Sequence, residues 1–132
     1  MAQLENLDRF IAVKKKNHGI YARELAGVPG ITFLGVPEGT APNYWFYSVL
    51  VESKVYGKSR DKLMSAMIAA GIECRPVWLP NHMQKPYAGC RSYRIEKAPW
   101  FLSRVLNVPC SSALSEAEVV RVASFIKRFG KT

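Results

Sequence analysis

The segment 75–87 contains the densest group of side chains that can bind a small ligand. It reads Arg-Pro-Val-Trp-Leu-Pro-Asn-His-Met-Gln-Lys-Pro-Tyr and follows a predicted strand. Its three prolines fix φ and remove backbone donors, so the segment is predicted to be stiff and irregular. Polar and aromatic groups on a loop of this kind are typical of a binding site, because a rigid scaffold positions them.

Five side chains of this segment are candidate substrate-binding residues: Arg75, Trp78, His82, Gln84 and Tyr87. The guanidinium of Arg75 suits bidentate binding of a carboxylate or a phosphate. The imidazole of His82 can donate a hydrogen bond to a phosphate or a sugar hydroxyl, and Trp78 and Tyr87 can flank a ring. A well-packed surface loop with a structural arginine has the same composition, so both interpretations stay open.

The chain offers no self-contained catalytic, cofactor-binding or metal-binding set. Its histidines are His18 and His82, and neither has an acidic cluster beside it. The sequence contains no phosphate-binding glycine loop and neither an HExxH nor a CxxC motif. Cys74, Cys90 and Cys110 are odd in number and widely spaced, so we expect reduced thiols, with neither a disulfide framework nor a zinc site.

Composition indicates a packed, basic domain without a membrane segment. Hydrophobic residues make up 48% of the 132 residues and charged residues 22%, and the net charge is +9. Apart from the run 14–16 the basic residues are spread out, so we expect a solvated basic face or attraction of phosphate, and no nucleic-acid partner. No apolar run reaches the roughly 18 residues that span a bilayer, and no secretory signal is evident. These absences favour a cytoplasmic location.

The elements that must position the loop begin with a long helix over 3–25. An apolar stripe recurs along it at three- and four-residue spacing, at Leu4, Leu7, Ile11, His18, Tyr21 and Leu25. Lys14 interrupts this stripe, and Gly27 with Pro29 ends the helix. We expect His18 to be a histidine at the edge of the core. The length of the helix suggests a connector to something outside the chain.

The remaining pattern alternates strands and helices. Strands are predicted at 31–34, 44–51, 72–78 and 105–108, a loop or single turn at 81–89 and a partly helical segment at 91–103. Ser59 and Gly71 bound a helix over 59–70. Ser115 and Glu118 form a capping box for a last helix that ends at Gly130. This order predicts an α/β (α+β) two-layer domain with a small sheet covered by helices.

Four stretches carry a resemblance to a known family. They are Gln-Leu-Glu-Asn-Leu-Asp at 3–8, Asn-Tyr-Trp-Phe-Tyr at 43–47, Gly-Ile-Glu-Cys-Arg-Pro-Val-Trp at 71–78 with the loop that follows, and 96–99 with 106–112. In this order they resemble the C-terminal third of the DegT/DnrJ/EryC1/StrS family of sugar aminotransferases. The segment 94–114 is especially similar to the branch that aminates UDP-linked 4-keto sugars toward legionaminic-type nonulosonic acids.

The resemblance implies that residues 1–132 are the small domain of a dimeric, fold-type I pyridoxal-phosphate enzyme, with 1–26 as the linking helix. It also implies that the small sheet is mostly antiparallel. Such an enzyme moves an amino group from an amino acid such as glutamate to a nucleotide-linked keto sugar. In the family the cofactor-anchoring lysine lies in a large N-terminal domain, so we expect the chain alone to be inactive and to bind no cofactor. The loop with Arg75, Trp78, His82, Gln84 and Tyr87 corresponds to the segment that closes over the nucleotide-sugar substrate.

Two further expectations concern partners. A free-standing binding or protein-interaction module from a truncated or mobile gene remains the alternative to an aminotransferase fragment. Without a large domain, the chain should expose part of its helical stripe and form a homodimer through it. The side chains expected at this surface are Leu4, Leu7, Ile11 and Tyr21, with Trp78 and Trp100.

Overall fold

The architecture is a four-stranded antiparallel sheet with helices packed on one face. The computed structural model describes residues 2–130. The strand order is β1-β2-β4-β3, formed by Ile31–Phe33, Tyr47–Val51, Val105–Val108 and Arg75–Pro76. The register pairs Ile31 with Val51, Tyr47 with Val108 and Arg75 with Asn107. The expected two-layer fold with a small antiparallel sheet is confirmed.

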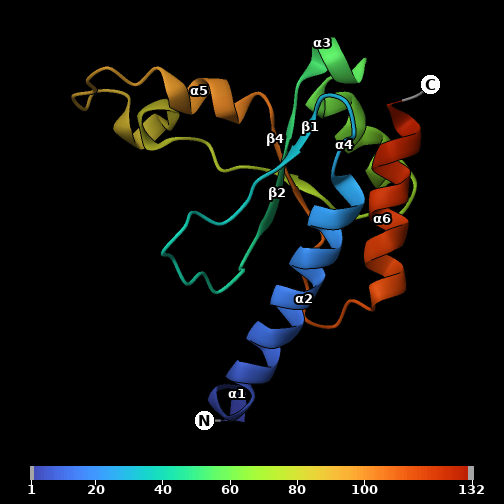
Figure 1. The fold of residues 1–132 in the computed structure, drawn as a ribbon. Coiled ribbons are helices and arrows are strands. Elements are labelled where there is room, and N and C mark those ends of the chain that lie inside the picture. Colours follow the sequence, from blue (N-terminus) through green and yellow to red (C-terminus); the bar gives the residue numbers. More distant parts are fainter. Residues whose placement is uncertain (1, 131–132) are drawn as a thin grey trace.

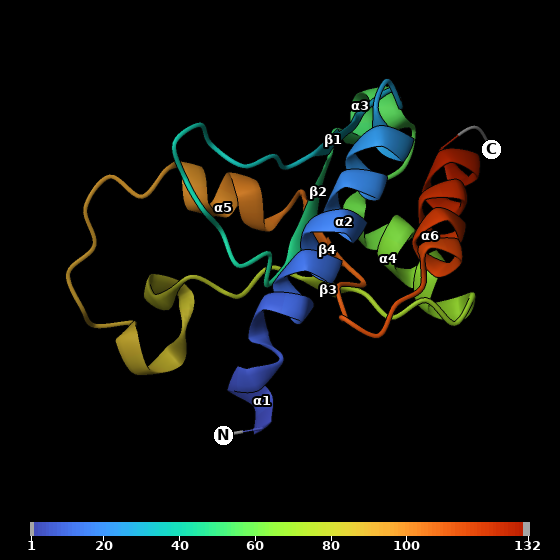
Figure 2. The same ribbon diagram turned by 60° about the horizontal axis from the view of Figure 1, so that its bottom comes forward.

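Three helices cover one face of this sheet: α2 (Leu7–Leu25), α4 (Arg60–Ala69) and α6 (Glu116–Phe129). Figure 1 shows α2 and α6 side by side, and Figure 2 shows both, with α4, on the same side of the strands. Two short helices, α1 (Ala2–Glu5) and α3 (Ser53–Tyr56), complete this half of the molecule. The core lies between the sheet and these helices.

Alternation along the strands directs side chains into this core. Tyr47, Val49 and Val51 of β2 are nearly inaccessible and belong to the core cluster, whereas Leu50 lies outside it. A period of two is expected where each strand presents one face to the helices. The buried phenol of Tyr56 donates its hydrogen bond to the carbonyl oxygen of Ile126 at 2.7 Å, which avoids the penalty of an unsatisfied buried hydroxyl.

The helix ends follow the predicted capping chemistry. Ser59 accepts from the N–H of Lys62 at the start of α4. At the end of α4 the N–H of Ile72 donates to Met67 while Gly71 has φ +71°, the left-handed conformation that closes many helices. At α6, Ser115 and Glu118 form the reciprocal capping box. These predicted helix boundaries are confirmed.

The far face of the sheet carries an extension that we call the arm, residues 77–102. It contains two short 3-10 turns, η1 (Asn81–Met83) and η2 (Lys85–Tyr87), and helix α5 (Lys97–Leu102). In both ribbon views the arm reaches away from α2 and α6 (Figure 1, Figure 2). The arm positions most of the predicted loop residues outside the body of the domain.

Three sequence expectations need correction. The strand predicted at 72–78 is limited to Arg75–Pro76, because Pro76 cannot donate and β3 is an edge strand. The strand predicted at 44–51 begins at Tyr47, because Tyr44 has φ 52° and the chain turns there. The helix predicted at 3–25 is divided after Glu5 into α1 and α2.

The apolar stripe of the first helix is only partly exposed. Leu4 is 71% exposed and Leu7 45%. Leu4 belongs to α1 and Leu7 begins α2, and α1 with the start of α2 projects from the body (Figure 1). Ile11 is half-buried, whereas Tyr21 is fully buried in the core. Tyr21 therefore does not belong to the exposed surface predicted for self-association.

Candidate functional site

A pocket of about 520 Å³ opens where β3 and β4 approach the start of α6, and we call it the basal pocket. Its floor is apolar, with Ile72, Val108 and Val122 among the lining residues. The polar and aromatic side chains that line it include Lys14, Trp45, Phe46, Arg75, Asn107 and Arg121, and two carboxylates, Glu73 and Glu118, line it as well. A concave site with an apolar floor and a few convergent polar groups is typical of ligand binding.

Lys14 connects three separate segments at the edge of the basal pocket. Its Nζ donates to the carbonyl oxygen of Cys110 at 2.6 Å, and to those of Trp45 at 3.4 Å and Tyr44 at 3.5 Å. The ammonium also lies 5.8 Å from the ring centroid of Tyr47. The residue that interrupts the apolar stripe of α2 therefore fixes the segment before β2 against the segment after β4.

Asn107 and Arg75 stand opposite each other on β4 and β3. Asn107 is 7% exposed, and its Oδ1 accepts a hydrogen bond from Ser48 Oγ at 2.6 Å. Arg75 pairs with Glu73 at 2.5 Å, but both side chains are 77% exposed. Exposed ion pairs contribute only about 0–1 kcal/mol, so a phosphate can compete with Glu73 for the guanidinium.

Three aromatic side chains gather beside the basal pocket, and we call Trp45, Phe46 and Trp78 the aromatic platform. The ring centroids are 4.8 Å apart for Trp45 and Phe46, 4.9 Å for Phe46 and Trp78, and 6.0 Å for Trp45 and Trp78. Trp45 is 63% exposed and Trp78 is 67% exposed. Large aromatic rings with this exposure are available for binding.

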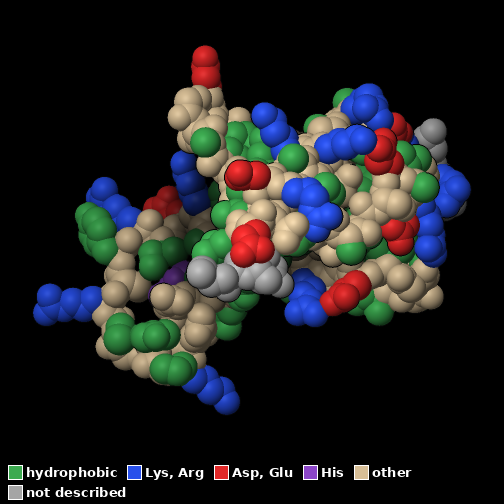
Figure 3. All heavy atoms as spheres, turned by 90° about the horizontal axis from the view of Figure 1, so that it is seen from below, with side chains coloured by type: hydrophobic (Ala, Val, Ile, Leu, Met, Phe, Trp, Pro, Cys, Tyr) green, Lys and Arg blue, Asp and Glu red, His purple; other side chains and the backbone are tan. Residues whose placement is uncertain are grey.

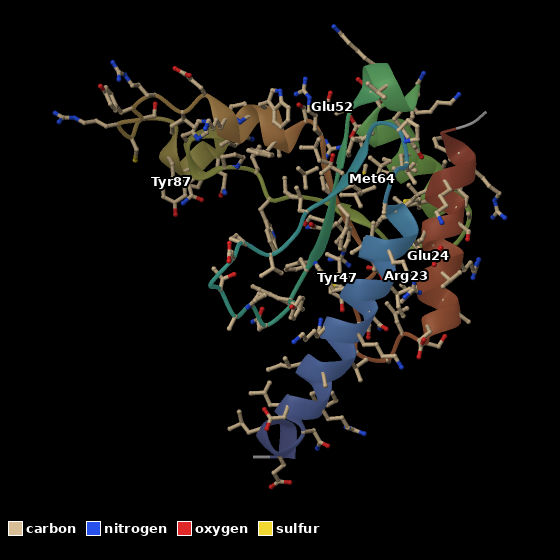
Figure 4. The ribbon with its side chains drawn as sticks, viewed as in Figure 1. Arg23, Glu24, Tyr47, Glu52, Met64 and Tyr87 are labelled. Carbon is tan, nitrogen blue, oxygen red and sulfur yellow. The ribbon has the colours of Figure 1, made fainter. Side chains whose placement is uncertain are left out.

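The arm holds a second, smaller hollow of about 330 Å³. His82 and Tyr87 line it together with Arg91 and Cys90. Gln84 makes a hydrogen bond within the arm: its Nε2 donates to the carbonyl oxygen of Leu79 at 2.8 Å. Figure 4 shows Tyr87 on the arm, far from Tyr47 in the sheet.

The five predicted loop residues therefore fall into separate groups. Arg75 lines the basal pocket, Trp78 belongs to the aromatic platform, and His82 and Tyr87 share the arm hollow. Sequence reasoning missed the residues that other segments contribute beside Arg75 and Trp78: Lys14, Trp45, Phe46 and Asn107. Lys14 stood out as a lysine within an apolar stripe, and Trp45, Phe46 and Asn107 lie in two of the stretches that carry the family resemblance.

Within the described residues, neither the thiol of Cys74 nor the surface charges add a further binding site. Cys74 is buried, and burial raises the pKa of its thiol to about 11, with a smaller contribution from Glu73. Figure 3 shows Lys and Arg side chains distributed over the face seen from below, with acidic side chains among them. Among residues 2–130, no group of three His, Cys, Asp or Glu side chains is placed to hold a metal ion. No helix in the described part of the chain is long and apolar enough to cross a membrane.

Comparisons with known proteins point to one family. The sequence model of the DegT/DnrJ/EryC1/StrS aminotransferase family matches residues 1–127. GDP-perosamine synthase of Caulobacter vibrioides is 31% identical over 123 residues, which are 92% of this chain and 33% of the relative. GDP-perosamine synthase of Vibrio cholerae is 31% identical over 134 residues, covering 98% of this chain and 35% of the relative.

The fold of this chain also matches that of a solved structure. The structure of S. venezuelae DesV in complex with a ketimine intermediate superimposes with a TM-score of 0.87 at 25% identity. The match covers 99% of this chain and 34% of DesV. The chain thus spans about a third of the length of the proteins that it matches.

Proposed function

This chain belongs to the DegT/DnrJ/EryC1/StrS aminotransferase family, and we propose that it is the substrate-closing C-terminal part of a nucleotide-sugar aminotransferase. One observation carries the proposal: the family match extends over residues 1–127, while the chain spans only about a third of its relatives. Under this proposal residues 1–132 form the small domain, and the helical segment 1–26 links it to a large domain.

The one described lysine that lines the basal pocket does not fit the role of a cofactor anchor. Aminotransferases of this family use pyridoxal phosphate, which supplies the electron sink for moving an amino group and is attached through a lysine. Lys14 lines the basal pocket, but three carbonyl oxygens hold its ammonium. Lys127 is paired with Glu24, and Lys16 with Glu116. We therefore assign no step of cofactor chemistry to this chain.

What the chain contributes is recognition of the substrate. Arg75 offers a guanidinium at the basal pocket for the phosphate groups of a nucleotide sugar. His82 and Tyr87, on the arm, offer donors to sugar or phosphate oxygens. Closing the arm over a substrate that is held against a large domain would exclude water from the reacting carbon.

Within this class, we propose a keto sugar linked to a nucleoside diphosphate as substrate. The segment 94–114 suggests a UDP-linked 4-keto sugar on a route to legionaminic-type sugars. Two relatives at 31% identity are instead named for GDP-perosamine, so a GDP-linked sugar is the competing substrate. Parallel assays with both nucleotides separate the two.

The test is a chimera in which this chain replaces the matched third of the Caulobacter vibrioides relative. We expect the chimera to fold, to bind pyridoxal phosphate and to transfer the amino group of glutamate to a nucleotide-linked keto sugar. Arg75→Ala and His82→Ala should lower turnover at least about tenfold and leave the melting temperature nearly unchanged, since Arg75 is exposed and His82 lies on the arm. Met83→Ala is the matched arm control, because Met83 lies beside His82 on the same turn, is 46% exposed and offers no hydrogen-bond donor.

Two results would argue against this proposal. One is a folded, cofactor-loaded chimera that transfers no amino group to either nucleotide-linked sugar. The other is an Arg75→Ala chimera that unfolds while its activity per folded molecule stays intact. The second result would make Arg75 a structural residue.

A further inference from the structure

We propose that the aromatic platform is a stacking site for the nucleobase of a nucleoside diphosphate. This inference rests on the proposed function and extends it to Trp45 and Phe46, which lie outside the arm. Trp45 and Phe46 precede β2, whereas Trp78 follows β3, so the fold brings together two segments that are distant in sequence.

The geometry of the platform suits one planar ligand. Phe46 is half-buried and lies edge-on to Trp78 at an interplanar angle of 84°. It lies at 39° to Trp45, so it contacts both indoles and holds them in place. The two indoles are tilted by 45°, which allows a base to stack on one ring while the other contacts its edge. Rings that are already held lose less conformational entropy when a ligand binds.

The backbone that presents Trp45 is strained. Tyr44, immediately before it, has φ 52°, a conformation that costs a residue other than glycine about 1–2 kcal/mol. The N–H of Trp45 donates to Asn43 Oδ1 at 3.0 Å, and its carbonyl oxygen accepts from Lys14. Such strain persists where the surroundings enforce it and is concentrated at ligand sites.

Charge beside the platform identifies the class of ligand. Trp45 and Phe46 line the basal pocket together with Arg75 and Arg121, and with Glu73 and Glu118. Both carboxylates already have partners, because Glu73 pairs with Arg75 and Glu118 bonds to Ser115 in the capping box. Arg121 donates one hydrogen bond to the carbonyl oxygen of Ala70 at 3.3 Å. Its other N–H groups can donate to a ligand. A ligand that places a ring on the indoles and a diphosphate near these guanidinium groups satisfies both features. A neutral sugar would use only the rings.

The experiment uses the three indole N–H signals of this chain in ¹⁵N-labelled protein. On titration with GDP or UDP, the signals of Trp45 and Trp78 should shift, while that of Trp100 on α5 should not. Stacking on an aromatic side chain is worth about 1–3 kcal/mol per base, so Trp45→Ala and Trp78→Ala should each weaken binding about 5- to 150-fold. Trp100→Ala is the matched control, because Trp100 is also exposed (40%) but packs on Phe101 and Arg104.

Four outcomes would overturn the inference. In the first, neither indole shifts at about 10 mM nucleotide, a concentration that detects even millimolar affinity. In the second, ribose 5-phosphate or pyrophosphate shifts both indoles as strongly as GDP, which would indicate sugar or anion binding. In the third, both indoles become inaccessible to acrylamide in the chimera without nucleotide, which would make the platform a contact between domains. A chimera that transfers amino groups equally well with Trp45→Ala refutes the stacking site and leaves the proposed function intact.

Discussion

Replacing Lys14 with methionine should lower the free energy of unfolding by about 2 kcal/mol. Methionine keeps an unbranched apolar stem but removes the ammonium that bonds to Cys110 at 2.6 Å and to Trp45 and Tyr44 at 3.4 and 3.5 Å. A hydrogen bond from a charged donor contributes about 1.5–3 kcal/mol. Only the shortest of the three bonds has strong geometry, and the half-buried position lets water replace part of the loss. These considerations give the value of about 2 kcal/mol.

Urea denaturation followed by circular dichroism measures this change. Lys15→Met is the matched control, because Lys15 is the next residue of the same helix and is exposed. For a chain of 132 residues, 2 kcal/mol corresponds to a melting temperature lower by about 8 °C. Equal stability of the Lys14→Met and Lys15→Met variants would refute the reasoning that Lys14 fixes the segment before β2 against the segment after β4.

Three further predictions concern pH, the cofactor and self-association. Burial among aromatic rings lowers the pKa of His18 below 6.5, opposed by a weaker effect of a hydrogen bond with the backbone of Leu34. The unfolded chain therefore binds this proton more readily, so stability should fall as the pH drops below about 6.5, and His18→Gln should flatten the dependence measured by urea titration. Borohydride reduction after mixing with pyridoxal phosphate should give no stoichiometric pyridoxyl-lysine; one specifically modified peptide would contradict this. The exposed Leu4 and Leu7 should support a homodimer in sedimentation velocity, and Leu4→Glu should dissociate it, whereas a monomer at all concentrations would exclude it.

Local chemistry made the boundaries of α4 and α6 predictable from the sequence. The serine and glutamate of the capping box act on backbone atoms within one turn, and a glycine in the left-handed conformation ends α4. Interactions of this kind depend only on residues that are close in the chain. The two-layer fold followed from the order of elements, and the antiparallel sheet from the resemblance to the family.

Strand ends and the composition of the site could not be predicted in this way. Residues 44–46 have high β-propensity, but Tyr44 adopts a positive φ. The next two residues, Trp45 and Phe46, belong to the aromatic platform and not to a strand. Lys14 stood out only as a polar residue in an apolar stripe, because its acceptors lie about 30 and 96 residues away in the sequence. Contacts over such separations depend on tertiary packing, which a single sequence does not reveal.

The most direct test of the central proposal is amino transfer by the chimera of this chain with the rest of the Caulobacter vibrioides relative. The measurement is the glutamate-dependent formation of a nucleotide-linked amino sugar, with the UDP- and GDP-linked keto sugars assayed side by side. Size-exclusion chromatography and the absorbance of bound pyridoxal phosphate establish that the chimera is folded and loaded. We predict turnover that requires this chain and falls at least about tenfold with Arg75→Ala. A folded, loaded chimera without turnover on either substrate would contradict the account.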